Sequence, residues 1–361
     1  MYIKEIELKN FRNYGELALK FHEKVNILLG DNAQGKTNLI EGIYISSSGR
    51  SFRSGRDRDM ICFGRDLSKA KITASRDSRD IIVEIVIGEN EKGVKINGVK
   101  IKKTAELLKN ILIVVFSPDD LKIIKGDPER RRRFMDRELS QIRPSYYSDL
   151  FSYRKILMHR NALLRKNGVR AEEFEVWDSE LAEYGASVIR KRKAFIEKIS
   201  VISGEINKSI TNGKESLEVV YISSVFAGEN TKDVFYSSLK GNIKRDILKG
   251  NTETGPHRDD LRINVNGMDI RRFGSQGQQR SAALSLKLAE LRLIKEETDE
   301  EAVLLLDDVL SELDGERQNF LINSLKNVQL FITATEISDK IREKLPGGYT
   351  FYIKNGIAGG E

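Results

Sequence analysis

The feature that most constrains the fold of this chain is a glycine-rich segment close to its beginning. Its spacing, G-x-x-x-x-G-K-T, is that of a phosphate-binding loop, or P-loop. A buried-strand pattern over 24–29 precedes the segment, and an amphipathic helix pattern follows it. A strand, such a loop and a helix in this order predict a nucleotide-binding α/β fold. The residues are Gly30, Asp31, Asn32, Ala33, Gln34, Gly35, Lys36 and Thr37, with Asn38 included in the expected binding segment.

The residue types in this loop predict a chemistry as well as a fold. Glycines allow backbone N–H groups to turn inward and hold phosphate oxygens at a helix N-terminus. Lys36 is expected to neutralise the β and γ phosphates, and the Thr37 hydroxyl is expected to ligate Mg²⁺. The segment therefore predicts binding of a nucleoside triphosphate.

A second candidate element lies near the other end of the chain, where an apolar strand pattern delivers two carboxylates. Val303–Leu306 is followed directly by Asp307 and Asp308. In parallel α/β sheets, ligands bind at the carboxyl ends of the strands. Asp307 is then the expected partner of Mg²⁺, and Asp308 is the candidate to orient or deprotonate the attacking water. The alternative is a helix-capping pair after a core strand.

A third segment opens a long helix pattern. Ser275, Gln276, Gly277 and Gln278 precede leucines on one helix face, and a helix start of this kind can bind phosphate. One nucleotide can use two phosphate cradles only if the cradles face each other. Two copies of the chain, arranged head to tail across a two-fold axis, would achieve this. A plain serine N-cap is the alternative.

The amino-acid composition excludes several classes of protein. The single cysteine, Cys62, excludes an internal disulfide framework, and three dispersed histidines argue against a zinc site. The longest apolar run, Ile111–Phe116, is too short to span a membrane. With no signal-peptide pattern at the N-terminus, we expect a soluble intracellular protein.

The net charge of +7 in the 361-residue chain favours a polyanionic partner, although the excess is small. The arginines are clustered, and the alternative to DNA contact is that they form solvated helix and loop faces. The clusters consist of Arg130, Arg131, Arg132 and Arg133, and of Arg50, Arg53, Arg56 and Arg58.

The pattern of periodicities predicts where strands give way to helices. Strands are expected up to about residue 116, including a hairpin over 81–87 and 94–99, and helical spacing starts near 119. Two long helices are expected on either side of a turn at 166–170. Further strands at 217–223 and 260–265, a helix at 276–297, and strands at 302–306 and 329–333 then complete the expected αβ pattern.

Several longer segments together resemble the RecF family of bacterial recombination and repair proteins, relatives of Rad50 and SMC heads within the ABC ATPase superfamily. Four segments resemble the motifs of that superfamily. They are the P-loop (Walker A), the Ser275 segment (signature), the Asp307–Asp308 strand (Walker B) and Ser311–Asp314 (D-loop). The resemblance covers about residues 1 to 336. The segments that carry it are Lys9–Tyr14, Phe116–Leu121, Gly126–Asp136, Gly255–Leu261 and Leu306–Asp314.

This resemblance implies roles for individual residues. Arg12 would reach the nucleotide phosphates in the same chain, whereas Ser275, Gln276, Gly277 and Gln278 would form the signature that contacts the γ-phosphate of a second chain. Ser311 and Asp314 would form the D-loop that couples the two sites. Asp308 stands where the superfamily usually has glutamate, which suits slow hydrolysis.

The resemblance also implies an architecture: an ABC-type ATPase head with a mixed-sheet P-loop lobe and a mainly helical second lobe, a truncated relative of an SMC coiled coil. The expected domains are 1–116 (lobe I with Walker A), 117–297 (lobe II with the signature helix) and 298–361 (lobe I with Walker B and D-loop).

The implied function is that of a cytoplasmic, slow, DNA-stimulated ATPase with ATP and Mg²⁺ as cofactors. Its ATP-bound dimer would clamp single- or double-stranded DNA without sequence preference. With RecO and RecR it would help load RecA on gaps coated with single-strand binding protein, in recombination, replication restart and the SOS response to DNA damage. Arg130–Arg133, Arg53 and Arg56 are the candidate DNA contacts.

The residues leave four alternative functions open. An ABC-type ATPase subunit that drives a membrane partner would be expected to carry a Q-loop glutamine and a switch histidine, and Thr335 stands near the latter position. A chromosome-scaffold head would need sustained heptads. A nuclease could use His257, Asp259 and Asp260 as a metal site. A small-molecule kinase would explain the P-loop but not the Ser275 segment.

Overall fold

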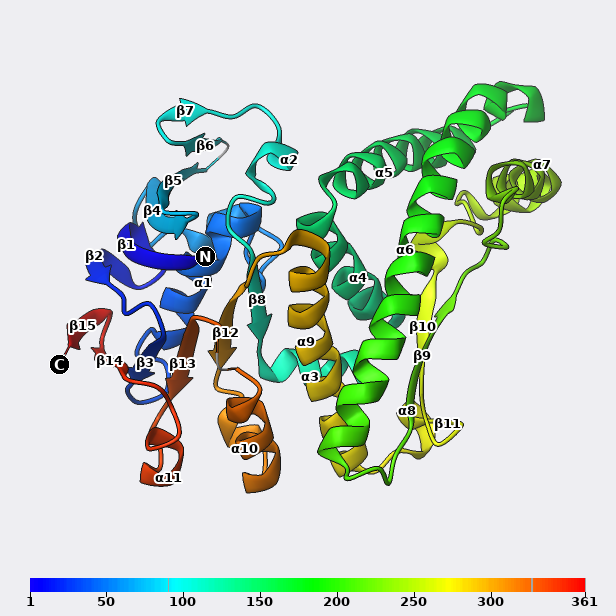
Figure 1. Ribbon diagram of the computed structural model, residues 1–361. Helices are drawn as coiled ribbons and strands as arrows, with labels where there is room; N and C mark the ends of the chain where they lie inside the picture. Colours follow the sequence, from blue (N-terminus) through cyan, green and yellow to red (C-terminus); the bar gives the residue numbers. More distant parts are fainter. Residues whose placement is uncertain (90, 326, 361) are drawn as a thin grey trace. The chain divides into compact units, whose positions relative to one another are not determined.

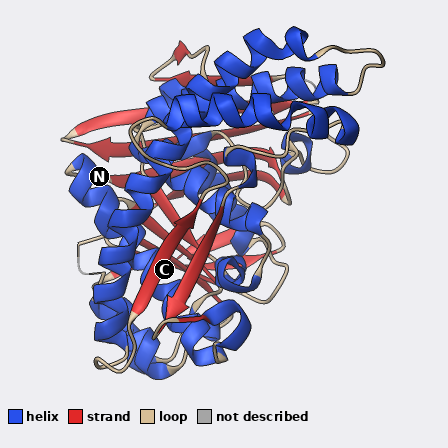
Figure 2. Ribbon diagram, turned by 90° about the vertical axis from the view of Figure 1, so that its right-hand side faces the viewer, coloured by secondary structure: helices blue, strands red, loops and turns tan. Residues whose placement is uncertain are grey.

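The computed structural model describes residues 1–89, 91–325 and 327–360. The chain forms two compact units: unit 1 comprises Met1–Leu121 and Glu290–Glu361, and unit 2 comprises Lys122–Ala289. The described residues form both helices (blue in Figure 2) and strands (red), which confirms the mixed α/β class. The domain boundaries expected after residues 116 and 297 stay predictions.

Unit 1 contains a six-stranded antiparallel sheet in the order β2-β1-β4-β5-β6-β7. Along β1, Ile6 and Leu8 are buried while the intervening Glu7 is exposed, so the sheet has one apolar face. The expected hairpin is present, but an Asn97-Gly98 turn divides its second arm into β6 and β7. The strands are β1 Tyr2–Phe11, β2 Tyr14–Lys20, β4 Leu67–Arg76, β5 Arg79–Gly88, β6 Lys92–Ile96 and β7 Val99–Lys100.

The second sheet of unit 1 has the order β15-β14-β3-β13-β12-β8, and every pair in it is parallel except β14 with β15. The sequence-based expectation that the strand near 329–333 ends the αβ pattern is wrong, because β14 and β15 follow and β14 pairs with β3 (Figure 1). The strands are β3 Val25–Leu29, β8 Ile113–Phe116, β12 Val303–Asp307, β13 Leu330–Ala334, β14 Gly348–Lys354 and β15 Ile357–Gly360.

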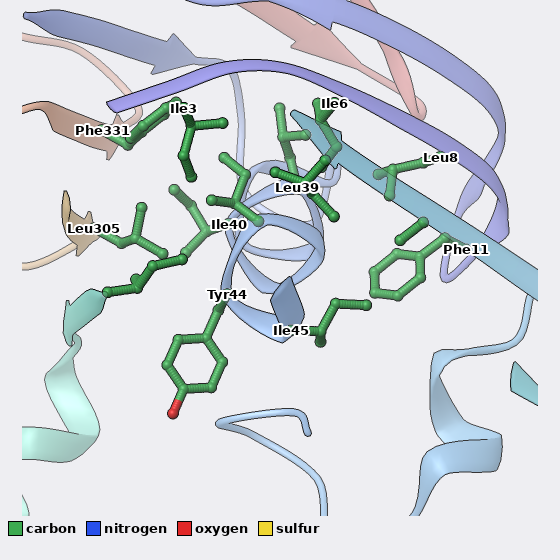
Figure 3. Close-up of a cluster of buried hydrophobic side chains, with 14 of the residues drawn as sticks. Ile3, Ile6, Leu8, Phe11, Leu39, Ile40, Tyr44, Ile45, Leu305 and Phe331 are labelled. Atoms are coloured by element: carbon green, nitrogen blue, oxygen red, sulfur yellow. The ribbon is translucent and has the colours of Figure 1, made fainter. Parts of the chain in front are cut away.

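Helix α1, Lys36–Ser48, is buried between the two sheets. Figure 3 shows Leu39 and Ile40 of this helix among Ile6 of β1, Leu305 of β12 and Phe331 of β13. Burying an aliphatic side chain of this size stabilises the fold by about 1.5–3 kcal/mol. The core therefore fixes the start of α1, where the P-loop ends.

The described part of unit 2 contains a three-stranded antiparallel sheet and several helices, which include the four given below, the short Ile270–Phe273 helix and most of the Gln276–Thr298 helix. The two long helices expected around residues 166–170 are confirmed as α5 and α6, whereas α7 was not predicted. Tyr153, Leu181, Ile189 and Phe235 belong to a buried cluster within this unit. The elements are α4 Pro128–Ile142, α5 Pro144–Leu164, α6 Glu175–Ile210, α7 Thr231–Lys249, β9 Leu217–Ile222, β10 Asp260–Val265 and β11 Met268–Asp269.

Shorter helices and the signature helix complete the chain. The 276–297 helix is confirmed as α9, Gln276–Thr298. Within the described ranges, no helix combines the length and the apolar character needed to cross a bilayer. The remaining helices are α2 Thr104–Leu107, α3 Pro118–Lys125, α8 Ile270–Phe273, α10 Gly315–Asn323 and α11 Asp339–Arg342, with 3₁₀ turns at Asp57–Met60, Ala171–Phe174, Pro256–Arg258 and Leu310–Glu312.

Candidate nucleotide-binding site

The P-loop connects β3 to α1 in unit 1, as the sequence predicts. The Lys36 ammonium folds back over the loop and donates hydrogen bonds to the carbonyl oxygens of Gly30 at 2.6 Å and Asp31 at 2.9 Å. Lys36 is only 4% exposed. The loop therefore carries a buried cation at the N-terminus of a helix, which is a suitable arrangement for binding phosphate.

Two glycines of the loop are required by close packing as well as by backbone conformation. Gly30 has φ 153°, and a Cβ there would lie 2.3 Å from the carbonyl oxygen of Ile353. Gly35 has φ 121°, and a Cβ would lie 2.7 Å from Asn13 Nδ2. Another residue at position 30 would press on the backbone of β14 and displace the loop, and another residue at position 35 would displace the side chains of Asn13 and Tyr14.

Two residues at the β1–β2 turn hold the loop from the outside. Asn13 Nδ2 donates to the carbonyl oxygen of Gln34 at 3.0 Å, and the Tyr14 hydroxyl donates to that of Gly35 at 3.0 Å. Asn13 Oδ1 also accepts from Asn38 Nδ2 at 2.8 Å. Burial raises the pKa of Tyr14, so its hydroxyl stays protonated and can donate. Sequence reasoning did not assign these contacts, although both residues lie in the Lys9–Tyr14 segment.

Asp307 ends β12 beside the P-loop helix. Its Oδ1 accepts from the Thr37 hydroxyl at 2.8 Å and from the Thr333 hydroxyl at 3.0 Å. Burial raises the pKa of Asp307, so a neighbouring cation would stabilise its charged form. A hydroxyl and a carboxylate are oxygen ligands of the kind Mg²⁺ prefers, and this pair therefore fits the expected ion.

Asp308 has a strained backbone that the surrounding hydrogen bonds maintain. Its φ of 53° is in the left-handed region, which costs a residue other than glycine about 1–3 kcal/mol. The Asp308 N–H donates to the Thr333 hydroxyl at 2.8 Å, and the Asp308 carbonyl accepts from the Ser311 hydroxyl at 2.8 Å. Thr333, which sequence reasoning missed, thus contacts both acidic residues.

The expected D-loop residue Asp314 is the N-cap of α10. Its carboxylate accepts from the Arg317 N–H at 3.0 Å. This backbone hydrogen bond lowers the pKa of Asp314, so the carboxylate is charged at neutral pH. Its coupling role between two copies stays a prediction.

Arg12 lies near the P-loop but contacts a carboxylate. Its guanidinium makes two hydrogen bonds with Glu41, at 2.8 Å and 2.7 Å, and Glu41 is fully buried. Arg53 donates to Asn38 Oδ1 at 2.8 Å, and Arg56 is exposed. The expected contact of Arg12 with phosphate stays a prediction, as do the DNA contacts of Arg53 and Arg56.

The Ser275 segment begins α9 with a reciprocal cap. The Gln278 N–H donates to the Ser275 hydroxyl at 3.2 Å, and the Ser275 N–H donates to the Gln278 side-chain oxygen at 3.0 Å. Ser275 and Gln276 are exposed, whereas Gly277 and Gln278 are half-buried. The plain N-cap role is therefore present, and the contact with a second chain stays a prediction.

The arginine cluster at 130–133 divides into buried and exposed members. Arg131 is 2% exposed, pairs with Asp260 at 2.5 Å and donates to the carbonyl oxygen of Gly126 at 2.7 Å. Its sequence-based assignment as a DNA contact does not fit this geometry, because the guanidinium is occupied inside unit 2. Arg130 and Arg133 are exposed on α4, and Arg132 is half-buried.

The residues of the nuclease alternative have structural partners. His257 Nδ1 accepts from the Tyr153 hydroxyl at 2.6 Å, and His257 Nε2 donates to the carbonyl oxygen of Thr252 at 2.8 Å. Burial lowers the pKa of His257 to about 4, which keeps the ring neutral. Asp259 pairs with a buried arginine and Asp260 pairs with Arg131. Among the described residues, no group of three His, Cys, Asp or Glu side chains could hold a metal.

The chain is similar in sequence to a known family of proteins. The family model of the RecF/RecN/SMC N-terminal domain matches residues 2–343. The DNA replication and repair protein RecF of Clostridium novyi is 46% identical over 346 residues, which is 96% of each chain. RecF of Alkaliphilus oremlandii is 45% identical over 362 aligned residues, which is 99% of each chain.

Two solved structures are similar over nearly the whole chain. Both are of the recombination mediator protein RecF in the RecFOR pathway, one with ATP and one with ATPrS. The ATP structure has a TM-score of 0.92 and 39% identity, and the match covers 100% of this chain and 97% of that one. The ATPrS structure has a TM-score of 0.91 and 39% identity, with 99% and 98% covered. These matches confirm the expected ABC-type head fold.

Proposed function

Because the chain belongs to the RecF family of ABC-type ATPases, we propose that it is an ATP-dependent DNA-binding protein of recombinational repair and replication restart. The observation that carries this proposal is the P-loop geometry: a buried Lys36 at a helix start, with Thr37 and Asp307 in contact. An ATP-bound relative of the same fold and length supports ATP as the nucleotide.

The P-loop residues 30–38 bind the ATP phosphates in this proposal. The Lys36 ammonium exchanges two loop carbonyls for phosphate oxygens, which offers the cation a stronger acceptor. Thr37 and Asp307 hold Mg²⁺, which offsets the phosphate charge when bound. Arg12 adds a second cation in the same chain if its guanidinium exchanges Glu41 for phosphate.

Asp308 orients or deprotonates the water that attacks the γ-phosphate. Its side chain is shorter than the glutamate usual in the superfamily, and hydrolysis is correspondingly slow. Binding of DNA stimulates this hydrolysis. The hydrogen bonds to Thr333 and Ser311 keep its backbone in the left-handed conformation during this step.

ATP joins two chains head to tail, because Ser275, Gln276, Gly277 and Gln278 of one chain contact the nucleotide of the other, with Ser311 and Asp314 coupling the two sites. The dimer clamps single- or double-stranded DNA through its phosphate backbone. Arg130, Arg132, Arg133, Arg53 and Arg56 are the candidate contacts. The clamp acts in the cytoplasm with RecO and RecR to help load RecA at gaps, and hydrolysis resets it.

Nucleotide binding and DNA binding can be tested together with a single substitution. A fluorescent ATP analogue is titrated into the protein, and binding of labelled duplex DNA is followed by anisotropy with and without Mg-ATP. Lys36→Ala is expected to abolish ATP binding and the ATP-dependent part of DNA binding. Lys24→Ala, at an exposed position just before β3, is the matched control and is expected to retain both.

Three results would contradict parts of the proposal. ATP binding by Lys36→Ala equal to that of the unaltered chain would remove the P-loop from the mechanism. DNA binding that is the same with and without ATP would remove the ATP-gated clamp. DNA affinity that fails to decline as salt increases would argue against contact with the phosphate backbone.

A further inference from the structure

The C-terminal hairpin β14–β15 touches the P-loop at its turn. The Asn355 N–H donates to the Gln34 side-chain oxygen at 2.7 Å, and the Gly356 N–H donates to the Gln34 carbonyl oxygen at 3.0 Å. The Gln34 carbonyl also accepts from Asn13 Nδ2. In Figure 1 the hairpin, in red, lies beside β3, in blue, and β3 leads into the P-loop. The hairpin lies beyond residue 343, where the match to the family model ends.

Close packing distinguishes this turn from two others of the same type. Asn97-Gly98, Asn266-Gly267 and Asn355-Gly356 all join antiparallel strands and all have positive φ at both residues. A Cβ at Gly98 or Gly267 would meet nothing within 4 Å. At Gly356 it would lie 2.4 Å from the carbonyl oxygen of Asn13, the residue that also binds Gln34.

We propose that the Asn355-Gly356 turn is a positioning element for nucleotide binding, which holds the P-loop in its phosphate-binding conformation through Gln34 and Asn13. This inference rests on the proposed ATP-binding function and assigns a part of that site to the hairpin.

The mechanism follows from the geometry of a peptide bond. In a trans peptide the carbonyl and the following N–H point in opposite directions. Because the Gln34 carbonyl is held toward the hairpin, the Gly35 N–H is turned away from it. This N–H belongs to the set of P-loop donors that would meet phosphate at the start of α1. Loss of the hairpin contacts would let the Gln34–Gly35 peptide rotate, so that fewer molecules present a complete cradle.

Gly356→Ala tests this positioning role, and Gly98→Ala is its matched control. Both place alanine at the second residue of an Asn-Gly turn with a similar φ, of 72° and 80°, so the intrinsic backbone cost is the same. Only alanine at 356 forces Asn13 to move, by about 1 Å to reach ordinary contact, and misplacement of this size can cost up to about 100-fold in function.

The measurements are the dissociation constant for ATP, the turnover at saturating ATP, and the melting temperature without nucleotide. Gly356→Ala is expected to weaken ATP binding about 10-fold or more while turnover at saturation stays within about twofold, because a smaller binding-competent fraction raises the apparent dissociation constant. Gly98→Ala is expected to leave ATP affinity within about twofold. Gly356→Ala is expected to melt below Gly98→Ala, because only Gly356→Ala carries the clash with Asn13, and Gly98→Ala reports the backbone cost alone.

A second pair of variants addresses the turn without adding a clash. Asn355→Gly tolerates the positive φ and is expected to retain ATP affinity, whereas Asn355→Val disfavours it and is expected to weaken binding. Equal ATP affinities for Gly356→Ala and Gly98→Ala would overturn this inference alone. Failure of the unaltered chain to bind ATP would overturn the proposed function and this inference together.

Discussion

Arg192 is the residue whose removal would test most sharply whether the polar groups of unit 2 are structural. It lies on α6 and is 2% exposed. Its guanidinium donates to Asp136 at 2.7 Å, Asp259 at 3.3 Å, the carbonyl oxygen of Pro256 at 2.6 Å and the Tyr146 hydroxyl at 3.0 Å. It thereby connects α4, α5 and α6 to the Gly255–Leu261 segment.

Arg192→Met keeps the length of the side chain and removes its charge and its donors. Two carboxylates then lose their shared buried cation. Asp136 keeps its ion pair with Arg154 at 2.7 Å, and Asp259 keeps only its contacts with neutral donors such as the Tyr221 hydroxyl, so Asp259 is the carboxylate left without a cation. Removing one partner of a buried ion pair costs about 3–5 kcal/mol. For a unit of this size, each kcal/mol lowers the melting temperature by about 2–4 °C, so we expect a decrease of about 6–20 °C.

Scanning calorimetry measures this change, with Arg190→Met as the control on the same helix. Arg190 is exposed, and its substitution is expected to change stability by less than about 0.5 kcal/mol. ATP affinity should be unchanged in both variants, because the P-loop belongs to unit 1.

A pH series adds a test of the cause. Burial already raises the pKa of Asp259, and loss of Arg192, which opposes this shift, would raise it further. A folded-state pKa above the unfolded value favours the folded state at low pH, so the deficit of Arg192→Met relative to the unaltered chain should shrink as pH falls toward 4. A melting temperature equal to that of Arg190→Met, or a deficit that grows with acid, would refute the reasoning.

Three further predictions concern single residues. Thr333→Val removes the hydroxyl that binds Asp307 and the Asp308 N–H, and we expect ATP turnover to fall about 10- to 100-fold at unchanged ATP affinity. Thr333→Ser, which keeps the hydroxyl, should stay close to the unaltered rate. Equal turnover for Thr333→Val and the unaltered chain would contradict this prediction. The folded-state pKa of His257 is lowered from 6.5 to about 4, so between these pH values the unfolded chain binds a proton that the folded chain does not. The free energy of unfolding in urea should therefore fall by up to about 3 kcal/mol from pH 6.5 to pH 4. His257→Gln should lose this pH dependence, and an unchanged pH dependence in the variant would count against the prediction. Ser275→Arg should retain ATP binding by the monomer and lose the ATP-dependent dimer in light scattering, and loss of nucleotide binding by the monomer would refute the two-chain site.

The parts of the site that the sequence predicted are those formed by consecutive residues. The P-loop, Asp307 with Asp308, and the helix after Ser275 each consist of a short pattern with a fixed local structure. A buried strand followed by a glycine-rich loop and a helix has few alternative arrangements, so the position of Lys36 between β3 and α1 follows from its neighbours.

The parts that the sequence did not predict depend on contacts between distant segments. Thr333 contacts Asp307 and Asp308 only because β12 and β13 pair in parallel with Asp307 opposite Thr333. Arg131 has the same local pattern as its exposed neighbours, and only the position of Asp260 shows that it is buried. Charge along a sequence cannot separate these cases.

The C-terminal hairpin is different, because its signal was present in the sequence. Phe351 and Ile353 alternate with exposed residues and are followed by Asn355-Gly356, a common two-residue hairpin turn. Period-2 alternation and this turn together predict β14 and β15. Their contact with Gln34, more than 300 positions away, required the structure.

The central claim is that ATP joins two copies of this chain. Light scattering of Asp308→Asn, in which we expect hydrolysis to be slower, measures the solution mass with and without Mg-ATP, and Lys36→Ala serves as the control. We predict one chain mass without nucleotide, two with Mg-ATP, and one for Lys36→Ala in either condition. A mass of one chain for Asp308→Asn at saturating Mg-ATP, with and without duplex DNA, would contradict the claim.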